Sequence, residues 1–124
     1  MIRPVRPALR ILVVDDYLDS RFVTCVALTM RGYTCDHVGG SADALAAIES
    51  FRPDVVVLEW ALRDGSGIGL AARLREASSA LGIALRVIAV SSQWEPWGLS
   101  TTEGFERYFS KPVSMDELDE LIAA

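Results

Sequence analysis

The stretch Asp54-Val55-Val56-Val57-Leu58-Glu59 (DVVVLE, residues 54–59) decides the fold of this chain. Its apolar residues are continuous rather than alternating, which is typical of a parallel strand that is covered on both faces. An acidic side chain, that of Glu59, stands where such a strand ends. Two more runs of this kind end at polar residues: Ile11–Val14 before Asp15-Asp16, and Val87–Val90 before Ser91. The pattern predicts buried parallel strands that each end at a polar side chain.

Segments with helical spacing alternate with these strands. The first carries apolar residues at Phe22, Val23, Val26, Ala27 and Met30. Residues that cap or open helices precede each segment: Asp19 or Ser20, Ser41, Ser66 or Gly67, and Ser114. Together with shorter strands at Thr34–Val38 and Arg107–Phe109, they predict an α/β fold. The expected architecture is a doubly wound five-stranded parallel sheet with helices on both faces. Pro96 and Gly98 predict a fourth helix that is short or degraded.

Length and composition fit a single domain over residues 1–124. Apolar residues make up 51% of the chain, yet the longest apolar runs fall far short of the roughly 20 residues that span a bilayer. A formal net charge of -5 argues against nucleic-acid binding by this domain alone. Because the N-terminus lacks the pattern of a signal peptide, we expect a cytoplasmic protein without membrane attachment. Cys25 and Cys35 are expected to be simple thiols.

Polar residues at or just beyond strand ends define the candidate site: Asp15, Asp16, Glu59, Ser91 and Lys111. The carboxyl ends of parallel strands meet at one edge of the sheet, where ligands bind, so we expect these side chains to lie together. Two carboxylates about 4 Å apart repel by roughly 4 kcal/mol at an effective dielectric constant near 20. A hard cation such as Mg2+, or the ammonium group of Lys111, would relieve that repulsion.

Four segments, in this order and spacing, resemble the receiver domain of two-component response regulators over essentially the whole chain. They are ILVVDD at 11–16, DVVVLEWALRDGSG at 54–67, VIAVSS at 87–92 and RYFSKP at 107–112. The resemblance implies a flavodoxin-like receiver fold with strand order 2-1-3-4-5 and a role in phosphorelay signalling rather than as an enzyme. It assigns Mg2+ to Asp15 or Asp16, to the acceptor carboxylate at residue 59 and to the backbone carbonyl of Ala61. It also places Ser91 and Lys111 on the phosphoryl oxygens, makes Tyr108 the aromatic switch, and implies a cis bond between Lys111 and Pro112.

Glu59 departs from the family, which has an aspartate acceptor at this position. The glutamate carboxylate reaches about one bond length further, and an ångström of misplacement can cost about a hundredfold in rate. Its single charge imitates a phosphate, which carries about 1.5 to 2 charges, only in part. We therefore expect an output that is independent of phosphorylation or constitutively biased, and a weakened Mg2+ site. Arg63 also departs from the family, which commonly has proline there.

Several alternatives stay open at this point. Glu59 is either natural or an engineered exchange in an ordinary receiver. A phosphotransfer-competent receiver could use another carboxylate, such as Asp16 or Asp64. A small-ligand or flavin-binding flavodoxin-like module is a third alternative, although no glycine-rich phosphate loop follows the first strand.

Protein partners follow from the resemblance, namely a sensor kinase or a downstream effector. Trp94 and Trp97 are candidate binding anchors. We therefore expect the partner contact on the face formed by Trp94–Tyr108. A homodimer is a further alternative.

Overall fold

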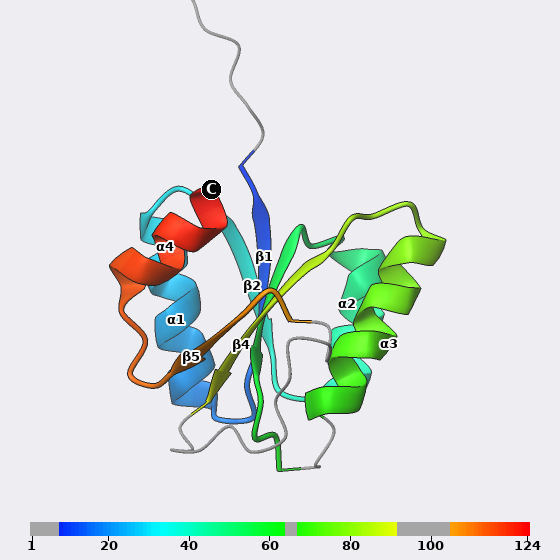
Figure 1. The fold of residues 1–124 in the computed structure, drawn as a ribbon, viewed down its shortest axis with the longest axis horizontal. Helices are drawn as coiled ribbons and strands as arrows, with labels where there is room; N and C mark the ends of the chain where they lie inside the picture. Colours follow the sequence, from blue (N-terminus) through cyan, green and yellow to red (C-terminus); the bar gives the residue numbers. More distant parts are fainter. Residues whose placement is uncertain (1–7, 64–66, 92–104) are drawn as a thin grey trace, which may run out of the picture.

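The computed structural model describes residues 8–63, 67–91 and 105–124. Within these ranges, nine elements follow in this order: β1 Arg10–Val14, α1 Leu18–Met30, β2 Thr34–Val38, α2 Ser41–Ser50, β3 Val55–Glu59, α3 Gly67–Ala80, β4 Arg86–Ser91, β5 Arg107–Ser110 and α4 Met115–Ala123. Figure 1 shows a central sheet between two layers of helices. The α/β alternation that the sequence predicts is confirmed. The predicted weak helix, Trp94 and Trp97 lie outside the described residues.

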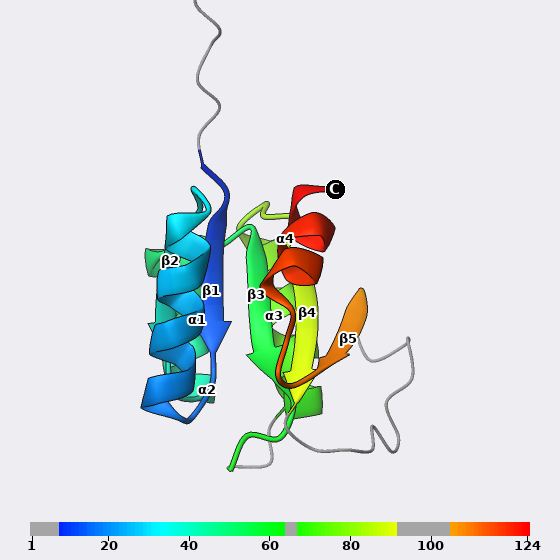
Figure 2. The ribbon, with the colours of Figure 1, turned by 90° about the vertical axis from the view of Figure 1, so that its left-hand side faces the viewer.

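The five strands form one parallel sheet in the order β2-β1-β3-β4-β5. In its centre, Val57 pairs with Val13 of β1 and with Ile88 of β4. Helices α1 and α4 cover one face, and α2 and α3 cover the other (Figures 1 and 2). The predicted doubly wound sheet and its strand order are therefore confirmed.

Strand β3 shows why its sequence is apolar without interruption. Val56 and Leu58 pack in the cluster beneath α2 and α3, whereas Val55 and Val57 pack in the cluster beneath α1 and α4. All four side chains are buried. Burial of one such side chain contributes about 1.5–3 kcal/mol. The two cores thus hold β3 between them and fix the position of Glu59 at its end.

Helix α1 differs from its prediction in both its start and its buried side. It begins at Leu18 after the extended residue Tyr17, and no side chain caps it, so the predicted cap at Asp19 or Ser20 is wrong. The helix buries Cys25 and Leu28, while Phe22, Val23, Val26 and Met30 are exposed. Because α1 lies mainly over the edge strand β2, only a narrow side of it faces the sheet.

The other helix predictions hold. Helix α2 begins at Ser41, α3 begins at Gly67, and the hydroxyl of Ser114 accepts a hydrogen bond from the Glu117 backbone N–H at the start of α4. Within the described ranges, no helix has the length and apolar character needed to cross a bilayer.

Candidate functional site

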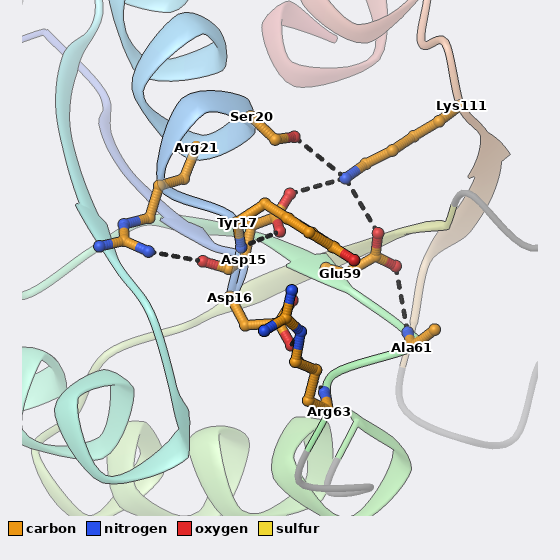
Figure 3. A network of polar contacts seen from close by, with 9 residues as sticks. All are labelled: Asp15, Asp16, Tyr17, Ser20, Arg21, Glu59, Ala61, Arg63 and Lys111. Carbon is orange, nitrogen blue, oxygen red and sulfur yellow. Dashed lines mark hydrogen bonds and ion pairs between the residues drawn. The ribbon is translucent and has the colours of Figure 1, made fainter.

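The carboxyl ends of β1, β3 and β5 bring three charged side chains into direct contact (Figure 3). Asp15 follows β1, Glu59 ends β3, and Lys111 follows β5. The Nζ atom of Lys111 lies 2.6 Å from Asp15 Oδ2 and 2.9 Å from Glu59 Oε1. It also lies 3.2 Å from the hydroxyl oxygen of Ser20, in the first turn of α1. Residues 96 positions apart in the chain thus meet at one edge of the sheet.

The three charged side chains are largely buried, so their charges must be balanced by one another rather than by water. The side chains of Asp15 and Glu59 are only 4% and 3% exposed, and that of Lys111 is 21% exposed. Burial alone lowers the pKa of Lys111, but its hydrogen bonds to Asp15 and Glu59 and their negative charges outweigh this effect. The net result is a raised pKa, so Lys111 keeps its charge and offsets the repulsion between the two carboxylates.

Backbone N–H groups hold the second oxygen of each buried carboxylate. The Tyr17 N–H donates to Asp15 Oδ1 at 2.9 Å, and the Ala61 N–H donates to Glu59 Oε2 at 3.0 Å. In both bonds the backbone N–H donates to the carboxylate of the residue two positions earlier, a pattern that is common in turns. Each carboxylate is therefore fixed from two sides, by Lys111 and by its own loop.

Asp16 is held separately, by Arg63 in the loop after β3. Its Oδ2 atom accepts a hydrogen bond of 2.7 Å from the Arg63 backbone N–H and lies 3.7 Å from the Arg63 Nε atom. The guanidinium group of Arg63 stands over the Tyr17 ring, 4.5 Å from the ring centroid. A hydrogen bond to Tyr17 and the negative charge of Asp16 raise the pKa of Arg63. Among the described residues, Asp16 Oδ1 is buried and has no hydrogen-bond partner.

This arrangement does not fit a Mg2+ ion. Five of the six carboxylate oxygens of Asp15, Asp16 and Glu59 already face a donor of the protein, and only Asp16 Oδ1 does not. Across residues 8–63, 67–91 and 105–124, no three His, Cys, Asp or Glu side chains stand close enough to hold a metal ion. Mg2+ prefers near-octahedral oxygen ligands at about 2.0–2.1 Å. In this arrangement Lys111 and Arg63 are the cations that lie against these carboxylates.

The remaining predicted residues lie on β4 and β5. Ser91 ends β4 and is fully buried, and its carbonyl accepts a hydrogen bond of 2.7 Å from the Lys111 N–H. Glu59 pairs with Val90, so Ser91 stands one residue beyond it on the neighbouring strand. Tyr108 is half-buried in β5. The Lys111–Pro112 bond is cis, as expected. The roles that the sequence assigns to Ser91 and Tyr108 remain predictions.

Two residues of this network, Ser20 and Arg63, make contacts that were not predicted from the sequence. Ser20 appeared there as a helix cap, but its hydroxyl faces Lys111. Arg63 was noted only as a departure from the family, but its backbone N–H donates to Asp16, which lies 47 positions earlier in the chain. Spacing along the chain could have shown that Ser20 lies within one helical turn of Asp16. The path of the loop that brings Arg63 to Asp16 has no comparable sequence signal.

Comparisons with known proteins identify the family of this chain. The family model for the response regulator receiver domain matches residues 11–123. Curated relatives include the phosphate regulon transcriptional regulatory protein PhoB of Pseudomonas aeruginosa, 33% identical over 87% of this chain and 47% of that protein. Another is the transcriptional regulatory protein KdpE of Mycobacterium tuberculosis, 35% identical over 86% of this chain and 46% of that protein. The chain spans about half the length of these relatives.

Solved structures show the same likeness. A CheY-like receiver domain from Methylobacillus flagellatus has a TM-score of 0.80 and 29% identity, and the match covers 94% of this chain and 97% of that one. The response regulator TrrA of Thermotoga maritima, solved in complex with Mg2+-BeF, has a TM-score of 0.77 and 27% identity, with 93% and 96% covered. The chain therefore belongs to the response regulator receiver domain family, the signalling modules of two-component systems.

Proposed function

We propose that this receiver domain signals without phosphorylation of residue 59, through protein–protein contacts. One observation carries the proposal. The Glu59 carboxylate already binds Lys111 at 2.9 Å, and by resemblance to the family Lys111 would otherwise contact the phosphoryl group. Glu59 thus makes, in the resting protein, a contact that phosphorylation is expected to create.

The state of both Glu59 oxygens supports the proposal. Phosphoryl transfer requires an attacking oxygen in line with the leaving group, and its rate depends on that alignment. Oε1 faces Lys111 and Oε2 accepts the Ala61 N–H, so the carboxylate is held in place by donors on both oxygens. It would have to leave at least one of them to attack. The buried side chain, 3% exposed, leaves little room for that movement.

The charge of Glu59 supports a partial bias toward the active state. A carboxylate carries one negative charge, whereas a phosphoryl group carries about 1.5 to 2. The proposed output is therefore weaker than that of a fully phosphorylated receiver, yet constant in time. Receiver domains act on sensor kinases and effector domains, and we assign this domain a protein partner of that class.

Incubation with acetyl phosphate and Mg2+, followed by intact-mass measurement, tests the proposal. The wild-type protein is expected to gain no phosphoryl group, whereas Glu59→Asp, which removes the extra methylene, is expected to gain one. Glu49→Asp provides a matched control, because it shortens a glutamate in the same way at an exposed position of α2. It should remain unlabelled.

Peptide mapping of any label separates the alternatives. A phosphoryl group on Glu59 of the wild type contradicts the proposal. A label on Asp16 or Asp64 instead supports a phosphotransfer protein with a different acceptor; Asp64 lies outside the described residues.

A further inference from the structure

Arg63 contacts the cluster of Asp15, Asp16 and Glu59, called the acidic pocket below, through both its backbone and its side chain. The backbone N–H donates to Asp16 Oδ2 at 2.7 Å, and the Nε atom lies 3.7 Å from the same oxygen. The carboxylate is largely enclosed, with 14% of the Asp16 side chain exposed. One residue thus supplies both a neutral donor and a positive charge to a single oxygen.

Tyr17 holds the guanidinium group over the pocket. The ring lies under Arg63 at 4.5 Å from its centroid, which is a cation–π distance. Tyr17 is the residue directly before α1 and follows Asp16 in the chain. An exposed arginine side chain would otherwise lose much conformational freedom by staying near one carboxylate. Stacking on Tyr17 already restricts the conformations of the Arg63 side chain, so less conformational entropy is lost when its charge stays close to Asp16.

We propose that Arg63 is a built-in counter-ion that takes the place of a divalent cation in this pocket and makes its metal affinity low. Receiver domains generally bind Mg2+ at the phosphorylation site. Here three carboxylates face two cations, Lys111 and Arg63, so the cluster has one net negative charge. Without Arg63 these groups would carry two net negative charges, and the Coulomb attraction on a divalent ion would be stronger.

The geometry around Asp16 also lowers the affinity for a metal ion. Within the described part of the chain, Asp16 Oδ1 is the one carboxylate oxygen of the cluster without a donor. A metal ion that approached it would stand beside the Arg63 guanidinium group, which repels it, and would compete with two donors on Oδ2. The pocket therefore carries ligand atoms of the right chemistry together with a cation that opposes their use.

Binding of Mn2+, which takes similar oxygen ligands, tests this inference. Electron paramagnetic resonance measures the free ion directly, and competition with Mg2+ shows that both ions use the same site. Arg63→Ala is expected to bind Mn2+ about five- to tenfold more tightly than the wild type. The variant should fold normally, because the Arg63 side chain is 69% exposed.

Arg52→Ala is the matched control. It removes the same charge at an exposed position just before β3, at the end of the strand opposite to Glu59. Equal affinities for the wild type and Arg63→Ala would overturn the inference. An equal gain in Arg52→Ala would also overturn it, because the effect would then come from net charge alone. Neither result depends on whether Glu59 accepts a phosphoryl group, so this inference and the proposed function can fail separately.

Discussion

The ammonium group of Lys111 lies 2.9 Å from Glu59 Oε1, although β4 separates the strands from which the two residues come. The same group lies 2.6 Å from Asp15 at the end of β1. One side chain therefore joins both carboxylates across the sheet. Its removal would leave two buried negative charges facing each other.

Lys111→Met tests this relationship through stability. We expect a loss of about 3–5 kcal/mol in the free energy of unfolding at pH 7, since buried carboxylates would lose their partner. Urea unfolding at pH 7 measures this loss. A loss below about 1 kcal/mol at pH 7 would contradict the assigned role.

The pKa of Lys111 can be measured without overlap, because it is the only lysine in the chain. Nuclear magnetic resonance of its side chain is expected to show a pKa above the ordinary value of about 10.4. Since the folded pKa is raised, the stabilising contribution is complete below the unfolded pKa and disappears as the pH rises through the folded one. Glu59→Gln removes one cause of the shift and should lower the pKa of Lys111. An unchanged pKa in that variant would contradict the contact.

Arg86 closes the end of helix α4. Its guanidinium group donates to the carbonyls of Leu121 and Ile122, each at 2.8 Å, and binds Glu106 at 2.6 Å. These carbonyls belong to the last turn, where a cation is favourable. Arg86→Ala is expected to cost about 1–2 kcal/mol and to speed amide hydrogen exchange in α4. Arg73→Ala, at an exposed position of α3, should change stability by less than about 0.5 kcal/mol.

Helix α1 offers a paired test of which of its sides is structural. Leu28 is fully buried, and Leu28→Ala should cost about 2–5 kcal/mol. Val23 is 64% exposed, and Val23→Ala should stay within about 0.5 kcal/mol of the wild type. Urea unfolding of both variants measures the difference. Similar losses would mean that the outer side of α1 is packed in solution.

The strands could be predicted because their residues satisfy two cores at once. A run such as Val55–Leu58 has no polar position, and a short apolar run of this kind, rich in β-branched residues, is typical of a strand covered on both faces. The cap at Ser114 was equally local, since the hydroxyl and its donor lie three residues apart. Predictions of this kind depend only on neighbours in sequence. The cap predicted at Asp19 or Ser20 was of the same kind and is wrong, because α1 begins at Leu18.

The errors and omissions have a different origin. Helix α1 carries apolar residues on two sides, so its periodicity does not say which side faces the sheet; the edge position of β2 decides it. At the site, strand ends predicted that Asp15, Glu59 and Lys111 would meet. The contact between Arg63 and Asp16 depends on the course of a loop, and no periodic pattern encodes that course.

The three hydrogens of the Lys111 ammonium group have three acceptors, on Asp15, Glu59 and Ser20. Any anion that enters the pocket must therefore exchange with one of them rather than simply add. The Ser20 hydroxyl is the neutral one of the three and the weakest competitor. An anion that displaced the Ser20 hydroxyl would therefore remove the bond between Lys111 and the first turn of α1.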